Sequence, residues 1–185
     1  MSKRSFLKEF FKAKRMVGAV VPSSRFLAKK MLKSIDFHNA KVIIELGPGT
    51  GVFTKEIIAQ LNKETQLIVI ELNDAFYDAL NNRYHESNLH IKHGSAADIN
   101  IILEQLKLPK ADFIISSLPL SNFSVALREE VLEKIKLNLK SEGKYIQFQY
   151  TRQLKKLYSI YFKKVAIGYT PLNIPPAFVY TCSNS

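Results

Sequence analysis

The chain has 185 residues, a length that suits one α/β domain and leaves little room for a second. Hydrophobic residues make up 46% of it, which excludes a disordered chain, and no apolar run approaches the ~20 residues that span a bilayer. The net charge is +11, of which residues 1–33 carry +9, while residues 34–185 are nearly balanced. A lone cysteine, Cys182, excludes an internal disulfide and indicates a reducing cytoplasm.

Residues 1–35 are predicted to form a basic amphipathic helical extension of a single domain, 1–185. From Ser5 onward, apolar residues recur at three- and four-residue steps, and basic residues gather on the opposite arc. A second helix is predicted to begin after Pro22-Ser23-Ser24, where a serine can cap it. It is expected to run to about Lys33, with inward positions at Phe26, Leu27 and Met31. The charge of residues 1–33 predicts a polyanionic partner, either an anionic membrane surface or RNA.

Strand and helix patterns alternate through the remainder of the chain. Apolar runs suited to buried strands lie at residues 42–46, 67–72, 89–92, 113–116 and 145–150. Helical patterns lie between them at residues 52–61, 75–83, 99–106 and 125–139. This alternation predicts an α/β fold with a mostly parallel sheet and helices on both faces. Two more candidate strands, 164–169 and 177–182, are expected to pair antiparallel at one edge.

A glycine-rich loop, Glu45-Leu46-Gly47-Pro48-Gly49-Thr50-Gly51, joins the first predicted strand to the helix after it. Glycines at alternate positions let the backbone turn sharply and approach a ligand closely. The spacing differs from the G-x-G-x-x-G of dinucleotide sites, where the helix N-terminus faces a pyrophosphate. Glu45 would repel a pyrophosphate, but it suits the cationic methionyl portion of S-adenosylmethionine.

Two further loops supply candidate cofactor contacts. Glu71 ends the second strand, where a carboxylate can accept hydrogen bonds from both ribose hydroxyls. The run Gly94-Ser95-Ala96-Ala97-Asp98 follows the third strand, at the place where a loop would cover the adenine. Asp98 either accepts from the adenine amino group or caps the helix that begins at Ile99, and the residues leave both interpretations open.

The order of these motifs resembles the class I S-adenosylmethionine-dependent methyltransferases, whose fold is a seven-stranded, doubly wound sheet. The resemblance implies S-adenosylmethionine as the cofactor and a methyltransferase activity. The cofactor contacts that it implies fall on Glu45, Gly47, Pro48, Gly49, Thr50, Gly51, Glu71, Leu72, Ala97, Asp98 and Ser116.

Further segments are similar to the bacterial phospholipid N-methyltransferases, soluble enzymes that act on phosphatidylethanolamine at the membrane. These segments are residues 17–24, Ser116-Ser117-Leu118-Pro119-Leu120, Gln147-Phe148-Gln149-Tyr150 and residues 171–180. The resemblance implies N-methylation of an ethanolamine phospholipid by a cytoplasmic protein, associated peripherally with the inner face of the membrane through residues 1–33. One departure concerns the substrate entrance, because the second proline expected near Leu118-Pro119-Leu120 is absent.

Methyl transfer needs an amine nitrogen that has lost its proton and is aligned with the cofactor methyl. The backbone carbonyls of residues 116–119 are expected to orient that nitrogen, which makes Ser117, Leu118 and Pro119 the candidate catalytic residues. Tyr150 ends the fifth strand, and its hydroxyl is expected to hold the amine or the lipid phosphate; a core aromatic is the alternative. The four histidines form no metal-ligand pattern, so no metal is implied.

A more distant resemblance is to the rRNA adenine dimethyltransferases, which share the cofactor loop. Those enzymes carry Asn-(Leu/Pro)-Pro-(Tyr/Phe) after the fourth strand, where the amide binds the adenine amine and the ring stacks on the flipped base. Here the stretch reads Ser117-Leu118-Pro119-Leu120, without amide or ring, which favours a lipid over RNA. RNA stays an alternative, because basic charge attracts both kinds of phosphate. A third alternative, a non-catalytic cofactor-binding module, is disfavoured by the intact motifs.

Overall fold

The computed structural model describes residues 25–185, so the predicted helix from Ser5, the serine cap predicted for the second helix and the segment 17–24 lie outside the described residues. The helices are α2 (Arg25–Leu32), α3 (Val52–Ile58), α4 (Asp74–Asn81), α5 (Ile99–Leu106), α6 (Val125–Asn138) and α7 (Lys155–Tyr161). The strands are β1 (Val42–Leu46), β2 (Gln66–Glu71), β3 (Leu89–His93), β4 (Ala111–Ser116), β5 (Leu139–Gln149), β6 (Lys164–Thr170) and β7 (Ala177–Ser183).

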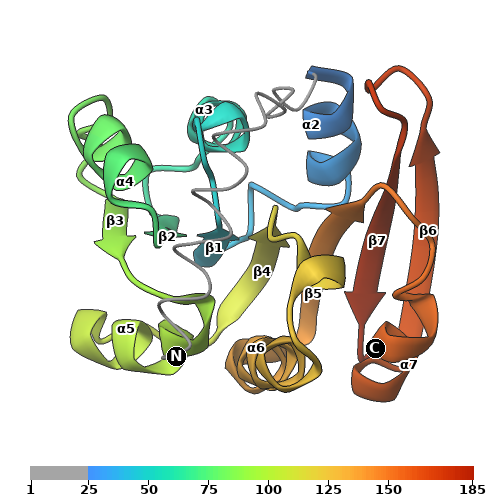
Figure 1. Cartoon of the computed structure of the whole chain (residues 1–185). Helices are drawn as coiled ribbons and strands as arrows, with labels where there is room; N and C mark the ends of the chain where they lie inside the picture. Colours follow the sequence, from blue (N-terminus) through green and yellow to red (C-terminus); the bar gives the residue numbers. More distant parts are fainter. Residues whose placement is uncertain (1–24) are drawn as a thin grey trace.

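All seven strands form one sheet in the order β3-β2-β1-β4-β5-β7-β6 (Figure 1). The first five in this order run parallel, and β7 pairs antiparallel with both β5 and β6. The mostly parallel, doubly wound sheet and its antiparallel edge are therefore confirmed. The connections leave in opposite directions from β1, and ligands bind at the carboxyl ends of strands at such a point.

Helices cover both faces of the sheet: α2, α3 and α4 lie on one face, and α5, α6 and α7 on the other (Figure 1). The central strand β1 is buried along its whole length because it contributes to both layers. Ile44 and Leu46 pack in the cluster with α5 and α6, whereas Ile43 packs with α2 and α3. This two-sided burial explains why β1 is a continuous apolar run interrupted only by Glu45.

Three local features differ from the prediction. Strand β5 begins at Leu139 rather than residue 145, where Leu139 pairs with Ala111 ahead of a register shift in β4. Helix α7 was not predicted, although Leu154, Tyr158 and Phe162 recur every four residues and are all buried. Phe26 was expected to face inward but is 56% exposed. The buried arc of α2 consists of Leu27, Ala28, Met31 and Leu32.

Candidate active site

The glycine-rich loop adopts a backbone that only glycine readily allows. Gly47, Gly49 and Gly51 have φ angles of 66°, 58° and 81°. A Cβ at Gly47 would lie 2.7 Å from Leu118 Cδ2, so the loop and the segment after β4 approach closely. A Cβ at Gly49 would meet nothing within 4 Å, which leaves open space over this part of the loop. A cradle of this kind fits a ligand that passes directly over the backbone.

Glu71 anchors the loop from the carboxyl end of β2. Its Oε2 accepts from the Gly49 N–H at 3.0 Å, and its Oε1 accepts from the Asn73 N–H at 2.8 Å. Burial raises the pKa of Glu71, against a lowering by these two backbone donors. Each carboxylate oxygen has a second lone pair, so Glu71 retains the capacity to accept from two ribose hydroxyls.

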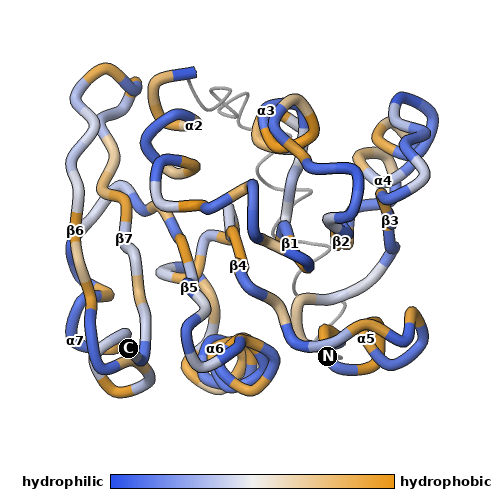
Figure 2. The backbone as a smooth tube through the Cα atoms, turned by 180° about the vertical axis from the view of Figure 1, so that it is seen from behind, coloured by the Kyte–Doolittle hydropathy of each residue, from blue (hydrophilic) through white to orange (hydrophobic). Residues whose placement is uncertain are grey.

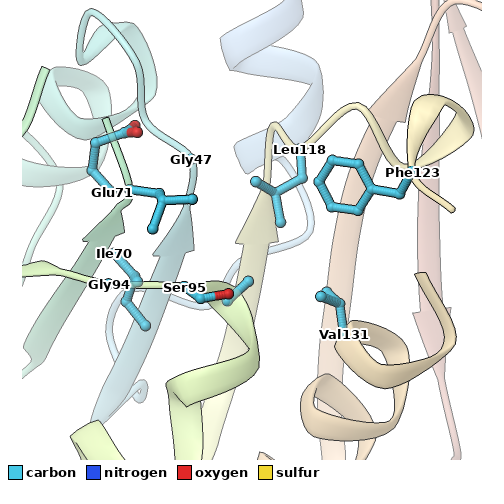
Figure 3. Close-up of a pocket in the computed structure, with 10 residues that line it drawn as sticks. Gly47, Ile70, Glu71, Gly94, Ser95, Leu118, Phe123 and Val131 are labelled. Atoms are coloured by element: carbon cyan, nitrogen blue, oxygen red, sulfur yellow. The ribbon is translucent and has the colours of Figure 1, made fainter. Parts of the chain in front are cut away.

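Glu71 also lines a small pocket at the carboxyl ends of β1, β2 and β4 (Figure 3). The lining residues are Gly47, Ile70, Glu71, Leu72, Gly94, Ser95, Ala96, Leu118, Phe123 and Val131. Glu71 and Gly47 lie on one side, and the side chains of Leu118 and Phe123 lie on the other (Figure 3). The sequence did not predict that Phe123 and Val131 line the pocket, because their place there depends on how α6 packs.

The loop after β3 forms a short 3-10 helix, Ala96–Asp98, that is capped by its own side chains. Ser95 Oγ accepts from the Ala97 N–H at 3.2 Å, and Asp98 Oδ2 accepts from the Ser95 N–H at 3.0 Å. Asp98 thus caps this turn, rather than the first turn of α5 as the alternative interpretation had it. Ser95 and Ala96 line the pocket, whereas Ala97 and Asp98 are not among the lining residues.

Glu45 is fully buried in β1, on the face covered by α3. Within residues 25–185, neither carboxylate oxygen has a hydrogen-bond partner of ordinary geometry. Burial raises its pKa to about 8, with a lowering by the nearby Thr54 hydroxyl and a further raising by the Glu71 carboxylate. An unpaired buried carboxylate is costly, so it fits a site that a cationic group completes, such as the ammonium of a methionyl portion.

The segment after β4 is tied to both neighbouring strands. Ser117 N–H donates to Leu46 O at 3.0 Å, and Ser116 Oγ accepts from the Leu118 N–H at 3.3 Å. The Ser117 hydroxyl oxygen is buried, and no partner for it occurs in the described part of the chain. Pro119 is half-buried, and its carbonyl accepts from the Asn122 N–H at 2.9 Å.

The Leu118 carbonyl is already occupied by two amides of β5. Gln147 Nε2 donates to it at 2.9 Å and Gln149 Nε2 at 3.2 Å, and the Leu120 N–H donates at 2.9 Å. This differs from the expectation that the Leu118 carbonyl orients an acceptor amine. Both glutamines are buried. In the sequence, Gln147 and Gln149 alternate with apolar residues, and this pattern could have indicated a pair of inward-facing amides. We call these two glutamines the glutamine clamp.

Tyr150 lies beyond the clamp and is 42% exposed. Its ring packs edge-on against Phe148, with 5.7 Å between the centroids. Burial raises the pKa of Tyr150, and a hydrogen bond with the Asn173 side chain lowers it. Its hydroxyl therefore stays protonated at neutral pH. Tyr150 is not among the residues that line the pocket beside Glu71; it contacts the turn between β6 and β7.

Thr50 and Pro48 complete the predicted cofactor loop. Thr50 is exposed, and its carbonyl accepts from Arg83 Nη1 at 3.2 Å. Pro48 is buried, and its carbonyl accepts from the Gly51 N–H. Both residues shape the loop through the backbone. In residues 25–185, no group of three or more His, Cys, Asp or Glu side chains is placed to hold a metal ion.

Comparison with known sequences brings the chain close to two kinds of methyltransferase. Residues 11–164 match the family described as ribosomal RNA adenine dimethylase. The ornithine lipid N-methyltransferase of Singulisphaera acidiphila is 31% identical over 179 residues, which are 96% of this chain and 93% of that protein. The ribosomal RNA small subunit methyltransferase A of Mycoplasma capricolum is 32% identical over 123 residues, 66% of this chain and 44% of that protein.

Solved structures share the fold. The magnesium protoporphyrin IX methyltransferase of Synechocystis PCC 6803, solved with bound S-adenosylmethionine, superposes with a TM-score of 0.69 at 8% identity. The superposition covers 100% of this chain and 98% of that chain. The chain thus spans nearly all of its lipid-methylating relative but less than half of its ribosomal RNA relative.

Proposed function

The chain belongs to the ribosomal RNA adenine dimethylase family and is an S-adenosylmethionine-dependent methyltransferase, and we propose that its methyl acceptor is the primary amine of a membrane lipid. An ethanolamine phospholipid is the first candidate. Residues 1–33 attach the protein peripherally to the inner face of the membrane in this proposal, through their basic charge. No helix within residues 25–185 has the length and apolar character needed to cross a bilayer.

The choice of an alkyl amine over an adenine amine as acceptor rests on the segment Ser117-Leu118-Pro119-Leu120. An adenine amine is a poor nucleophile because its lone pair is delocalised, so it needs a polar acceptor and a stacking ring. This segment offers no side-chain amide, its leucine at 120 is fully buried, and the Leu118 carbonyl is engaged by Gln147 and Gln149. An alkyl amine is intrinsically more nucleophilic once deprotonated, so a plainer apolar wall suffices for it.

The similarity to an ornithine lipid N-methyltransferase supports a lipid acceptor and adds a second candidate. An ornithine headgroup and an ethanolamine headgroup share an alkyl amine presented at a membrane surface. They differ in the anionic phosphate, which only the ethanolamine phospholipid has. The protonated Tyr150 hydroxyl is a hydrogen-bond donor that suits such a phosphate.

The residues of the pocket have separable roles in this proposal. S-adenosylmethionine supplies an activated methyl group and its own leaving group. Glu71 would hold the ribose, the turn Ala96–Asp98 would border the adenine, and Glu45 would complete the charge of the methionyl ammonium. Leu118 and Phe123 form an apolar wall that excludes water from the reacting amine.

A side-by-side assay with cofactor labelled in its methyl group tests the acceptor. The tubes contain phosphatidylethanolamine vesicles, ornithine lipid vesicles, or unmodified ribosomal RNA and ribosomal particles. We expect label in lipid, with phosphatidylethanolamine preferred. Label only in ornithine lipid would retain lipid methylation and reject the phospholipid. Label only in RNA would reject a lipid acceptor altogether. The Gly49→Val variant is the control for label that does not depend on the enzyme.

A further inference from the structure

Two segments far apart in the sequence contain no acidic residue. Residues 25–35 and 143–185 hold ten basic residues and no Asp or Glu. The ten are Arg25, Lys29, Lys30, Lys33, Lys144, Arg152, Lys155, Lys156, Lys163 and Lys164. Residues 36–142 between them hold eleven basic residues and fifteen acidic ones. The near balance of the chain beyond residue 33 therefore conceals a strong asymmetry.

The fold brings these two segments together at one end of the sheet, where α2, α7, β6 and β7 lie (Figure 1). Helix α2 packs against β6, since a Cβ at Gly168 would lie 2.7 Å from Lys30 Cε. From the loop before α7, the Arg152 guanidinium lies 5.7 Å from the centroid of the Phe178 ring on β7. We call this the acid-free end.

Aliphatic side chains project from the turn of the acid-free end. Leu172 is 62% exposed and Ile174 is 77% exposed, and both lie in the turn between β6 and β7. Hydrophobic residues mark this turn in the view from behind (Figure 2). Asn173 between them is buried, and its Nδ2 donates to Pro175 O at 2.7 Å. The turn is therefore built to hold two aliphatic side chains outward.

The strand register places this turn on the same edge of the sheet as the pocket. Gln149, at the carboxyl end of β5, is level with Phe178, and Thr170 pairs with Ala177 next to the turn. A chain of contacts joins the two places: Gln149 bonds the Leu118 carbonyl in the pocket wall, and Tyr150 bonds Asn173 in the turn. The turn and the pocket therefore lie at the same edge of the sheet, at different strands.

We infer that the turn of residues 171–176 inserts into the interface of an anionic bilayer, with Leu172 and Ile174 at the acyl boundary and with Lys30 and Arg152, the basic residues placed towards the turn's edge of the sheet, directed to the headgroups. This inference rests on the proposed lipid acceptor and adds the turn of residues 171–176 to the membrane contact proposed for residues 1–33. Basic charge beside exposed aliphatic groups is the chemistry of interfacial binding. RNA would use the charge, but it gains little from aliphatic side chains, since its bases stack on rings.

A single introduced tryptophan tests the insertion, because the chain has none. Leu172→Trp is the probe, and Leu137→Trp at the far end of α6 is the matched control, since Leu137 is 61% exposed. Vesicles contain phosphatidylglycerol and phosphatidylcholine in equal parts, with or without brominated acyl chains, and lack any substrate amine. We expect vesicles to blue-shift the emission at 172 and brominated chains to quench it, with neither effect at 137.

Two results would overturn the insertion. One is equal quenching, or none, at both positions. The other is emission at 172 that is blue-shifted before vesicles are added, which would mean that protein covers the turn. Emission at 172 that responds to ribosomal RNA and not to vesicles would assign the turn to RNA and would likewise overturn the inference.

A second matched pair measures how much the turn contributes. Ile174→Ser should weaken vesicle binding about tenfold, as expected for losing one buried aliphatic side chain. Ile160→Ser on α7 should not, although Ile160 is 74% exposed. Ile174→Ser should keep its activity on short-chain phosphatidylethanolamine dispersed as monomers. Equal vesicle binding by the two variants would defeat the inference and leave the proposed function standing, whereas no label in any lipid would defeat the proposed function itself.

Discussion

The two ends of the sheet differ in charge and in what their loops present. Around β2, α4 and β3, residues 62–98 hold six acidic and three basic residues, and Glu71 lies in the pocket there. The acid-free end, with α2, α7, β6 and β7, holds basic and exposed aliphatic residues instead. In the proposed function, a cationic cofactor binds at the first end and an anionic surface at the second, and the two make opposite electrostatic demands. The difference teaches that the two demands can be separated along a single sheet.

The largest expected effect concerns the end of the sheet around β2, α4 and β3, with the adjoining glycine-rich loop after β1, which we call the cofactor end. Gly49→Val places a β-branched side chain at φ 58°, in the open space over the loop. Backbone strain and lost space together should weaken S-adenosylmethionine binding by about 100-fold or more, as measured by calorimetry. Gly168→Ala on β6 is the control from the other end, because its Cβ meets only the flexible end of Lys30. Ordinary affinity in a folded Gly49→Val protein would contradict this account of the loop.

The pH dependence of stability should come mainly from a residue of the cofactor loop, Glu45. Because burial raises the pKa of Glu45 from 4.5 to about 8, the folded chain holds an extra proton across that window. Without cofactor, the free energy of unfolding should therefore fall as pH rises, by about 1.4 kcal/mol per pH unit, and level off above pH 8. Urea unfolding at a series of pH values measures this slope.

Glu45→Gln should reduce the slope, since it removes one titrating group and leaves Glu71, whose pKa burial also raises. The control is Glu64→Gln, because Glu64 is exposed and its hydrogen bond with Lys41 lowers its pKa. Glu45→Gln should also weaken cofactor binding if the carboxylate completes the methionyl site. The same slope in Glu45→Gln and the unaltered protein would assign the pH dependence elsewhere.

The smallest expected effect concerns Gln149 on β5, which lies between the cofactor end and the acid-free end. Gln149→Leu removes one amide from the Leu118 carbonyl and one acceptor from Ser121 Oγ. It should lower kcat on lipid about threefold to tenfold and stability by about 1 kcal/mol, with cofactor affinity unchanged. Gln153→Leu, at an exposed position, is the control. A loss of cofactor affinity equal to the loss of kcat would show that the clamp belongs to the cofactor end.

How much the sequence could predict differs between the same two ends. Local patterns predicted the bounds of β1 at 42–46, the turn at the alternating glycines and the place of Glu71 at the end of β2. The structure has β1 at these bounds, positive φ angles at the glycines and Glu71 in the pocket. The amino-terminal half of β5 is polar, and only its pairing with β4 makes it a strand. The sequence did not predict the acid-free end, because its two segments are separated by more than a hundred residues and only the fold brings them together.

The glutamine clamp has a consequence for the acceptor entrance. The segment that faces the acceptor in the proposed function is held by side chains from β5, in addition to the Ser116 hydroxyl and hydrogen bonds of its own backbone. In the proposed function, substitutions of Gln147 and Gln149 would therefore reshape the acceptor entrance from positions that do not themselves line the pocket beside Glu71. In the proposed function, this arrangement separates the side chains that hold the acceptor entrance from the carboxylate, Glu71, that anchors the cofactor loop.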